Sequence, residues 1–77
     1  MVVFALMELT SQAAEALAVL RQTCSELSYE VSEICHSSRW RLSALYLGRA
    51  GERQRLGLAY SEDREALEGL RGRLERS

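Results

Sequence analysis

The 77-residue sequence contains no proline and no lysine, and it has only two cysteines and one histidine. Cys24, Cys35 and His36 are too few for a four-ligand zinc site, and no CxxC pair is present. Local spacing gives His36 no partner for nucleophilic catalysis, and no phosphate-binding glycine motif occurs. We therefore predict that the protein is not an enzyme and uses no cofactor, metal ion or small-molecule substrate.

Long apolar runs are also missing from the sequence. The N-terminal stretch MVVFALM, residues 1–7, is far too short to cross a bilayer, and it lacks the basic residues and the cleavage site of a signal peptide. No continuous basic amphipathic helix points to binding at a membrane surface. We expect a cytoplasmic or nuclear protein in which both cysteines stay reduced.

Helix-forming residues fill most of the remaining chain. Its long segments are rich in alanine, leucine, glutamate, arginine and glutamine, and hydrophobic residues make up 47% of the sequence. Apolar residues recur in steps of three and four, which is typical of one face of a helix. The residues expected to pack helix against helix are Leu6, Ala13, Leu17, Leu20, Cys24, Leu27, Val31, Ile34, Leu42, Leu45, Tyr46, Leu56, Tyr60, Leu67, Leu70 and Leu74.

This spacing predicts an all-α fold, with residues 1–77 forming a single helical domain. We expect an antiparallel, coiled-coil-like helical hairpin, with a helix at about 6–35, a turn at 36–38 and a second helix at about 39–76. A chain this short buries only about 60–65% of the surface that it exposes when unfolded. Assembly into an oligomer or a hetero-complex would supply the missing stability.

The stretch GRAGERQRLG, residues 48–57, decides between two forms of this fold. Gly48 and Gly51 would each cost a helix about 1 kcal/mol relative to alanine, which favours a kink or a break at 48–51. Good helix formers from Glu52 onward leave a continuous helix open. If the helix is broken, the alternative fold is a self-contained three-helix bundle over roughly 9–35, 39–48 and 52–76.

Charge is distributed unevenly along a chain whose net charge is only −1. Residues 1–36 carry five glutamates and one arginine, whereas residues 37–60 carry five arginines and one glutamate. Opposite charges in neighbouring segments favour folding back or the recruitment of a second chain. Glu26, Glu30 and Glu33 are the candidate counter-charges for the arginines of the middle segment.

A second apolar face runs through the middle segment. Trp40, Ala44 and Leu47 follow one another in steps of four and three, and a helix that is apolar on two sides is usually enclosed by neighbours. We therefore predict that this face meets a partner protein, either a second copy or a helical hetero-partner, with Trp40 as its anchor. The candidate partner interface comprises Trp40, Ala44, Leu47, Arg49, Gly51, Arg53 and Leu58.

These features predict a non-catalytic helical interaction module that serves as a structural adaptor or assembly subunit. One alternative is a small helical chaperone or co-chaperone that holds an aggregation-prone partner in a secretion or assembly pathway. Another is nucleic-acid binding through the arginine-rich middle segment. The net negative charge and the acidic first segment both argue against nucleic acid as the partner.

Overall fold

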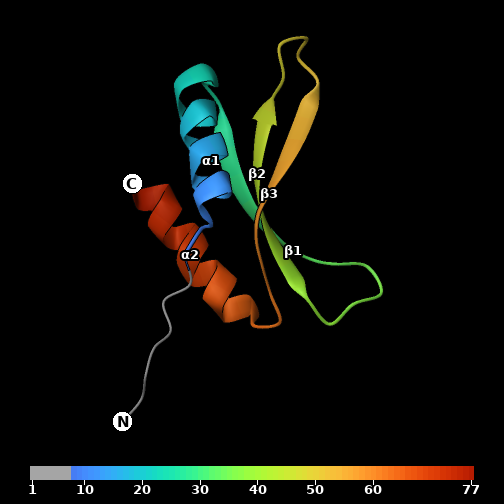
Figure 1. The fold of residues 1–77 in the computed structure, drawn as a ribbon. Helices are drawn as coiled ribbons and strands as arrows, with labels where there is room; N and C mark the ends of the chain where they lie inside the picture. Colours follow the sequence, from blue (N-terminus) through green and yellow to red (C-terminus); the bar gives the residue numbers. More distant parts are fainter. Residues whose placement is uncertain (1–7) are drawn as a thin grey trace.

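The fold is a three-stranded sheet with two helices, and the computed structural model describes residues 8–77 of it (Figure 1). The strands are antiparallel in the order β1-β2-β3, so that β2 is the central strand. Both helices lie on the same side of the sheet (Figure 1). In chain order the elements are α1 (Ser11–Thr23), β1 (Leu27–Glu33), β2 (Trp40–Leu47), β3 (Arg53–Ser61) and α2 (Arg64–Arg76).

The predicted all-α fold is therefore wrong, both as a coiled-coil-like helical hairpin and as a three-helix bundle. Of the predicted helix at about 6–35, only Ser11–Thr23 is helical among the described residues. The predicted turn at 36–38 lies in the connection between β1 and β2, and the predicted helix at about 39–76 consists of two strands followed by α2. The molecule is an α+β protein.

The segment that forms β1 shows why the spacing was misleading. Leu27 and Val31 are four residues apart, as on a helix, but Tyr29 between them packs against the same core. Leu27, Tyr29 and Val31 thus follow a period of two, which is that of a strand with one buried face. Aromatic and β-branched residues such as Tyr29 and Val31 also favour strands.

The hydrophobic core lies between the helices and the side of the sheet that faces them. Leu42 of β2 and Leu67 of α2 have no exposed surface, and Leu17 of α1 is 3% exposed. Full burial of a side chain of this size stabilises the fold by about 1.5–3 kcal/mol. The other buried core residues are Ala44, Leu58, Ala59 and Leu70, and Leu9, Ala13, Leu20, Leu27, Tyr29, Val31, Trp40, Leu56 and Leu74 pack against them.

Strand β3 contains a β-bulge. Leu42 pairs with Ala59 whereas the next residue, Ser43, pairs with Gly57, so that Leu58 has no partner on β2. A bulge of this kind bends its strand and changes the direction of the following side chains. Leu58 and Ala59 are both buried as a result, and Tyr60 returns to the side of the sheet away from the helices.

The connection between β2 and β3 is a tight turn. The Gly48 N–H donates to the Glu52 carbonyl at 2.8 Å, and the Gly51 N–H donates to the Gly48 carbonyl at 3.0 Å. Gly51 has a φ of 81°, a conformation that favours glycine. The break considered at 48–51 is thus present as a turn, but it joins two strands rather than two helices.

Each helix begins with a side-chain cap. Thr10 Oγ1 accepts a hydrogen bond from the Ala13 N–H at 3.1 Å, and Asp63 Oδ1 accepts one from the Glu65 N–H at 3.0 Å. These bonds satisfy donors that the first turn of a helix leaves unpaired. Within residues 8–77, neither helix is long and apolar enough to cross a membrane.

Arg21 ties the C-terminal ends of the two helices together. Its Nη2 donates to the Leu74 carbonyl at 3.3 Å and to the Ser77 hydroxyl at 2.8 Å, and it also reaches the Tyr29 hydroxyl at 3.3 Å. One side chain thereby links α1, α2 and β1. This link joins the ends of the two helices, which pack on one side of the sheet through the core.

Candidate interaction face

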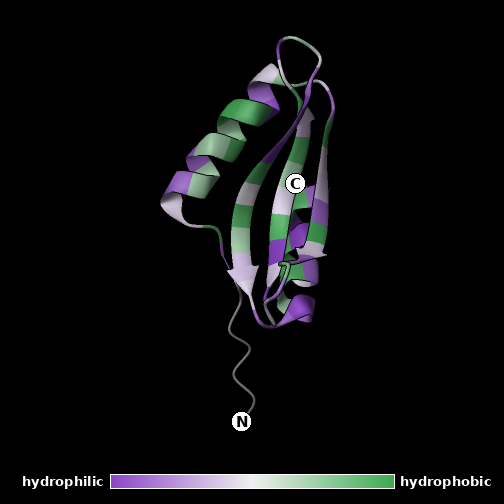
Figure 2. Ribbon diagram, turned by 90° about the vertical axis from the view of Figure 1, so that its right-hand side faces the viewer, coloured by the Kyte–Doolittle hydropathy of each residue, from purple (hydrophilic) through white to green (hydrophobic). Residues whose placement is uncertain are grey.

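The side of the sheet away from the helices is the open face, on which no described helix lies (Figure 2). Because side chains alternate along a strand, this face receives every second residue of each strand up to the bulge in β3. Hydrophobic and hydrophilic residues accordingly alternate along the strands (Figure 2). The open face comprises Ser28, Glu30 and Ser32 of β1, Arg41, Ser43, Leu45 and Leu47 of β2, and Arg53, Arg55, Gly57 and Tyr60 of β3.

The centre of the open face is closed by its own side chains. Glu30 of β1 and Arg55 of β3 form an ion pair at 3.1 Å that reaches across β2. Ser43, which pairs with Glu30 in the sheet register, has no exposed surface. Its Oγ has no hydrogen-bond partner among the described residues. A polar side chain is therefore enclosed in the middle of a face that is otherwise open to solvent.

One end of the open face is filled by Arg41 and Tyr60. These two residues are register partners on β2 and β3, and both lie next to Gly57. A Cβ at Gly57 would fall against the Tyr60 hydroxyl and 3.7 Å from Cδ of Arg41. The absence of a side chain at Gly57 thus allows the two large side chains to lie over β3.

The other end of the open face forms an open groove of about 850 Å³. Leu45 and Leu47 line its centre, and Leu47 is 44% exposed. Glu26, the residue before β1, lies on one side of the groove, and Arg53 of β3 lies on the other. The groove therefore has an apolar centre between an acidic edge and a basic edge.

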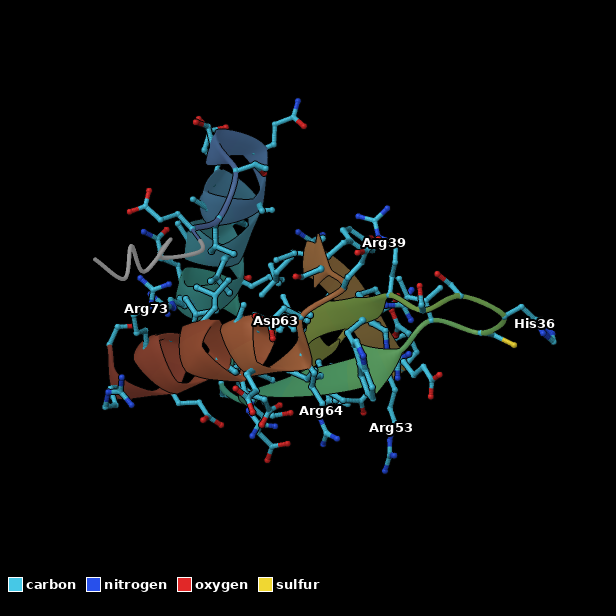
Figure 3. All side chains as sticks on the ribbon, turned by 90° about the horizontal axis from the view of Figure 1, so that it is seen from below. His36, Arg39, Arg53, Asp63, Arg64 and Arg73 are labelled. Carbon is cyan, nitrogen blue, oxygen red and sulfur yellow. The ribbon has the colours of Figure 1, made fainter. Side chains whose placement is uncertain are left out.

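Glu26, Leu47 and Arg53 lie in a single row across the sheet. Leu47 pairs with Arg53, and the pairing of Leu27 with Tyr46 places Glu26 beside Leu47. Neighbouring strands are about 4.8 Å apart, so about 10 Å separates the Glu26 and Arg53 backbones across β2. Within residues 8–77 neither side chain forms an ion pair, and Arg53 extends away from the ribbon (Figure 3).

The β2–β3 turn beside the groove carries the carboxylate of Glu52. Hydrogen bonding from its own backbone N–H lowers the pKa of Glu52; partial desolvation raises this pKa, while the Gln54 side chain and the Ala50 backbone lower it further. Gln54 Nε2 donates to Glu52 Oε1 at 3.3 Å. Glu52 therefore stays ionised at neutral pH.

The structure divides the predicted partner interface between the two sides of the sheet. Ala44 and Leu58 are core residues, and Trp40, the predicted anchor, packs against the same core. The Arg64 guanidinium lies over the Trp40 ring, 4.9 Å from its centroid. Steps of four keep a strand residue on the same side, which explains why Trp40 and Ala44 are covered together. The members of the predicted interface that are exposed are Leu47, Arg49, Gly51 and Arg53.

The predicted packing residues are divided in a similar way. Leu6 lies outside the described residues, while Leu45 and Tyr60 lie on the open face. Cys24 follows α1, and Ile34 follows β1. Tyr46 lies near the end of β2 and lines the groove. The remaining predicted packing residues lie in or against the core: Ala13, Leu17, Leu20, Leu27, Val31, Leu42, Leu56, Leu67, Leu70 and Leu74.

The three soft metal-ligand side chains lie apart from one another or at the surface. Cys24 and Cys35 are free thiols. Cys35 and His36 are both exposed in the β1–β2 turn, where His36 has a φ of 59°. In the part of the chain that the structure describes, no three His, Cys, Asp or Glu residues are grouped so that they could hold a metal ion.

Comparison with known proteins gives no relative. The chain matches no family model, no curated protein and no solved structure. Function must therefore be inferred from the open face itself.

A period of two among polar residues is the signal that would have identified the open face from the sequence. Ser28, Glu30 and Ser32 alternate with apolar residues, and Arg53 and Arg55 are likewise two apart. On a helix, the same residues would lie on different sides. Glu30, a predicted counter-charge, does meet an arginine of the middle segment, but the ion pair lies within one chain.

Proposed function

We propose that the protein is a non-catalytic protein–protein interaction module and that the open face is its binding surface. It acts as a structural adaptor or assembly subunit in the cytoplasm or nucleus, where its free cysteines remain reduced. The observation that supports this proposal is the groove in which Leu45 and Leu47 lie between Glu26 and Arg53.

An apolar centre bordered by charges of both signs suits the surface of another protein. Protein interfaces combine a hydrophobic centre with a polar, solvent-accessible rim. Removing Leu45 and the exposed Leu47 from water supplies affinity, since apolar burial contributes about 25 cal/mol per Å². Glu26 and Arg53 at the rim would then select the orientation of the partner.

Nucleic-acid binding is a second candidate because all three arginines of the strands lie on the open face together with Tyr60. Glu26 and Glu30 share this face, however, and Glu30 already neutralises Arg55. A phosphate backbone would therefore meet a surface with only part of its positive charge available. Binding of this kind would weaken steeply with added salt and would be detected with a short single-stranded oligonucleotide.

A pair of substitutions at exposed aliphatic residues tests the proposed function. Leu47→Asp places a carboxylate in the groove, whereas Val19→Asp places one on α1, where the Val19 side chain is 58% exposed. In extracts treated with a chemical cross-linker, which captures transient associations, we expect the tagged wild type and Val19→Asp to migrate in a complex larger than the monomer. Leu47→Asp should migrate as a monomer with an unchanged circular dichroism spectrum.

Two results would contradict the proposed function. One is a complex that Leu47→Asp leaves intact, because the open face would then not be the binding surface. The other is a monomer for all three cross-linked proteins, because the open face would then bind no partner.

A further inference from the structure

We infer that the occupant of the open face is a second copy of this chain, packed face to face about a two-fold axis that runs close to the direction of β2. This inference rests on the proposed function and specifies its partner. It follows from the way in which the charges are arranged across the strand order β1-β2-β3.

A half-turn about an axis along β2 exchanges the two edges of the sheet. It places β1 of one copy over β3 of the other, while β2 lies over β2. The row of Glu26, Leu47 and Arg53 then lies over the same row in the reverse order. Glu26 of each copy faces Arg53 of the other, and the symmetry forms this contact twice, as in any isologous dimer.

The distances across such a dimer suit these side chains. Packed sheets lie about 10 Å apart, a gap that a glutamate and an arginine extending from opposite sides can close. Within one chain the same two residues are about 10 Å apart on the same side of the sheet, where β2 lies between them. Pairing between copies thus gives each of the two unpaired charges a partner, while Leu45 and Leu47 bury their apolar surface against their own counterparts.

The other simple two-fold axis is disfavoured by charge. An axis across the strands would place β1 over β1 and β3 over β3. Glu26 would then approach carboxylates of the other copy, and Arg53 would approach its arginines, and like charges facing each other across an interface are destabilising. The charge pattern therefore selects the arrangement in which β1 faces β3.

The contact is concentrated at the groove end of the open face. Arg41 lies four residues from Leu45 on β2, which is about 13 Å along the strand. Because packed sheets cross at about 30°, the far ends of the two faces diverge and the two Arg41 side chains are kept apart.

The size of the face indicates a weak dimer. Three strands at about 4.8 Å spacing and about 25 Å in length would present roughly 350 Å² per copy even if the faces met along their whole length. An interface of this size belongs with transient associations, which dissociate on dilution. The ion pairs at its exposed edges should also make association weaker as salt is added.

Two charge-reversal variants and their mixture test the arrangement. Arg53→Glu alone places Glu26 opposite another carboxylate, and Glu26→Arg alone places Arg53 opposite another arginine. We expect each variant to self-associate at least about tenfold more weakly than the wild type. In a mixture, both contacts join opposite charges, so the two variants should form a heterodimer with an affinity near that of the wild-type dimer.

Sedimentation equilibrium across a hundredfold dilution at low salt measures each association, and circular dichroism confirms that each variant is folded. The mixture is its own control for folding, because misfolded variants would not recover association. A monomeric wild type, variants that self-associate normally, or a mixture that stays monomeric would each overturn the inferred dimer. If the purified wild type is monomeric while the complex in extracts still depends on Leu47, the proposed function stands and the partner is a different protein.

Discussion

Strand β2 and helix α2 carry leucines at the same spacing, yet they adopt different structures. Leu42 and Leu45 are three residues apart in β2, and Leu67 and Leu70 are three residues apart in α2. Both leucines of α2 are buried on one side of the helix, whereas Leu42 is buried in the core and Leu45 lies on the open face. Strand β2 also buries three consecutive residues, 42–44, which a helix with one apolar side does not do.

A helix and a central strand can both be apolar on two sides, but for different reasons. A helix of this kind needs protein on both sides, and the helical interpretation therefore predicts a partner against Trp40 and Ala44. A central strand can be apolar on two sides because its residues alternate between the two faces of the sheet, while its neighbouring strands form hydrogen bonds with its backbone. Trp40 and Ala44 of the second apolar stripe therefore belong to the core, whereas Leu47 lies on the open face.

The largest expected effect separates the two sides of β2. Leu42→Ala leaves a cavity at a site with no exposed surface and should lower the free energy of unfolding by about 2–5 kcal/mol. Leu45→Ala removes a side chain that is only partly buried and should cost about 1 kcal/mol. Urea denaturation at low protein concentration, where association does not contribute, measures both values. Equal losses would mean that β2 does not have one covered side and one open side.

The sequence contains much of the information for the helices and little for the sheet. Residues 11–23 and 64–76 lie within segments predicted to be helical, because their apolar stripes are one-sided and their other residues are good helix formers. The strands depend on pairing with residues distant in sequence, and β-propensity reflects this packing more than an intrinsic preference. Leucine and alanine in β2 therefore gave a helical signal that the neighbouring strands overrode.

The residues of the candidate site were only partly accessible from the sequence. The predicted partner interface contains Leu47 and Arg53, and both are exposed. The predicted partner interface also contains Trp40 and Leu58, which lie against or in the core, because a step of three keeps residues on one side of a helix but places them on opposite sides of a strand. The row that joins Glu26 to Arg53 depends on the register of three strands, which local spacing does not specify.

Two glycines extend the comparison to the backbone. A Cβ at Gly51 or at Gly69 would meet no atom within 4 Å, so neither site is crowded and the two sites differ in backbone conformation. Gly51→Ala must hold a φ of 81° and should destabilise the protein by about 1–2 kcal/mol. Gly69→Ala lies within α2 and should stabilise it by about 0.5–1 kcal/mol. Thermal unfolding of both variants measures whether each substitution lowers or raises stability. Stabilisation by Gly51→Ala would show that the turn is wrongly placed.

A smaller effect is expected from Ser43, the enclosed polar residue of β2. Ser43→Ala removes a buried hydroxyl that has no hydrogen-bond partner among the described residues, and it should leave stability unchanged or raise it by up to about 1 kcal/mol. Ser28→Ala is the matched control, since Ser28 is exposed on the same face and its replacement should change stability by less than about 0.5 kcal/mol. Chemical denaturation compares the two. A loss of more than about 1 kcal/mol for Ser43→Ala alone would indicate that the hydroxyl makes a stabilising contact.

The smallest expected effect depends on pH and arises at Glu52 in the turn between β2 and β3. Hydrogen bonding from its own backbone, and further from Gln54 and Ala50, lowers the pKa of Glu52 in the folded protein. A lowered folded pKa means that the ionised carboxylate stabilises the turn above the ordinary pKa of the group, and that this contribution is lost as pH falls through the folded pKa. The melting temperature of the wild type should therefore exceed that of Glu52→Gln at neutral pH, and the two should converge in acid. Helix α2 contains no such turn and should keep its helical signal in both proteins until global unfolding. A difference in melting temperature that persists below the folded pKa would mean that Glu52 acts through contacts that do not require its charge.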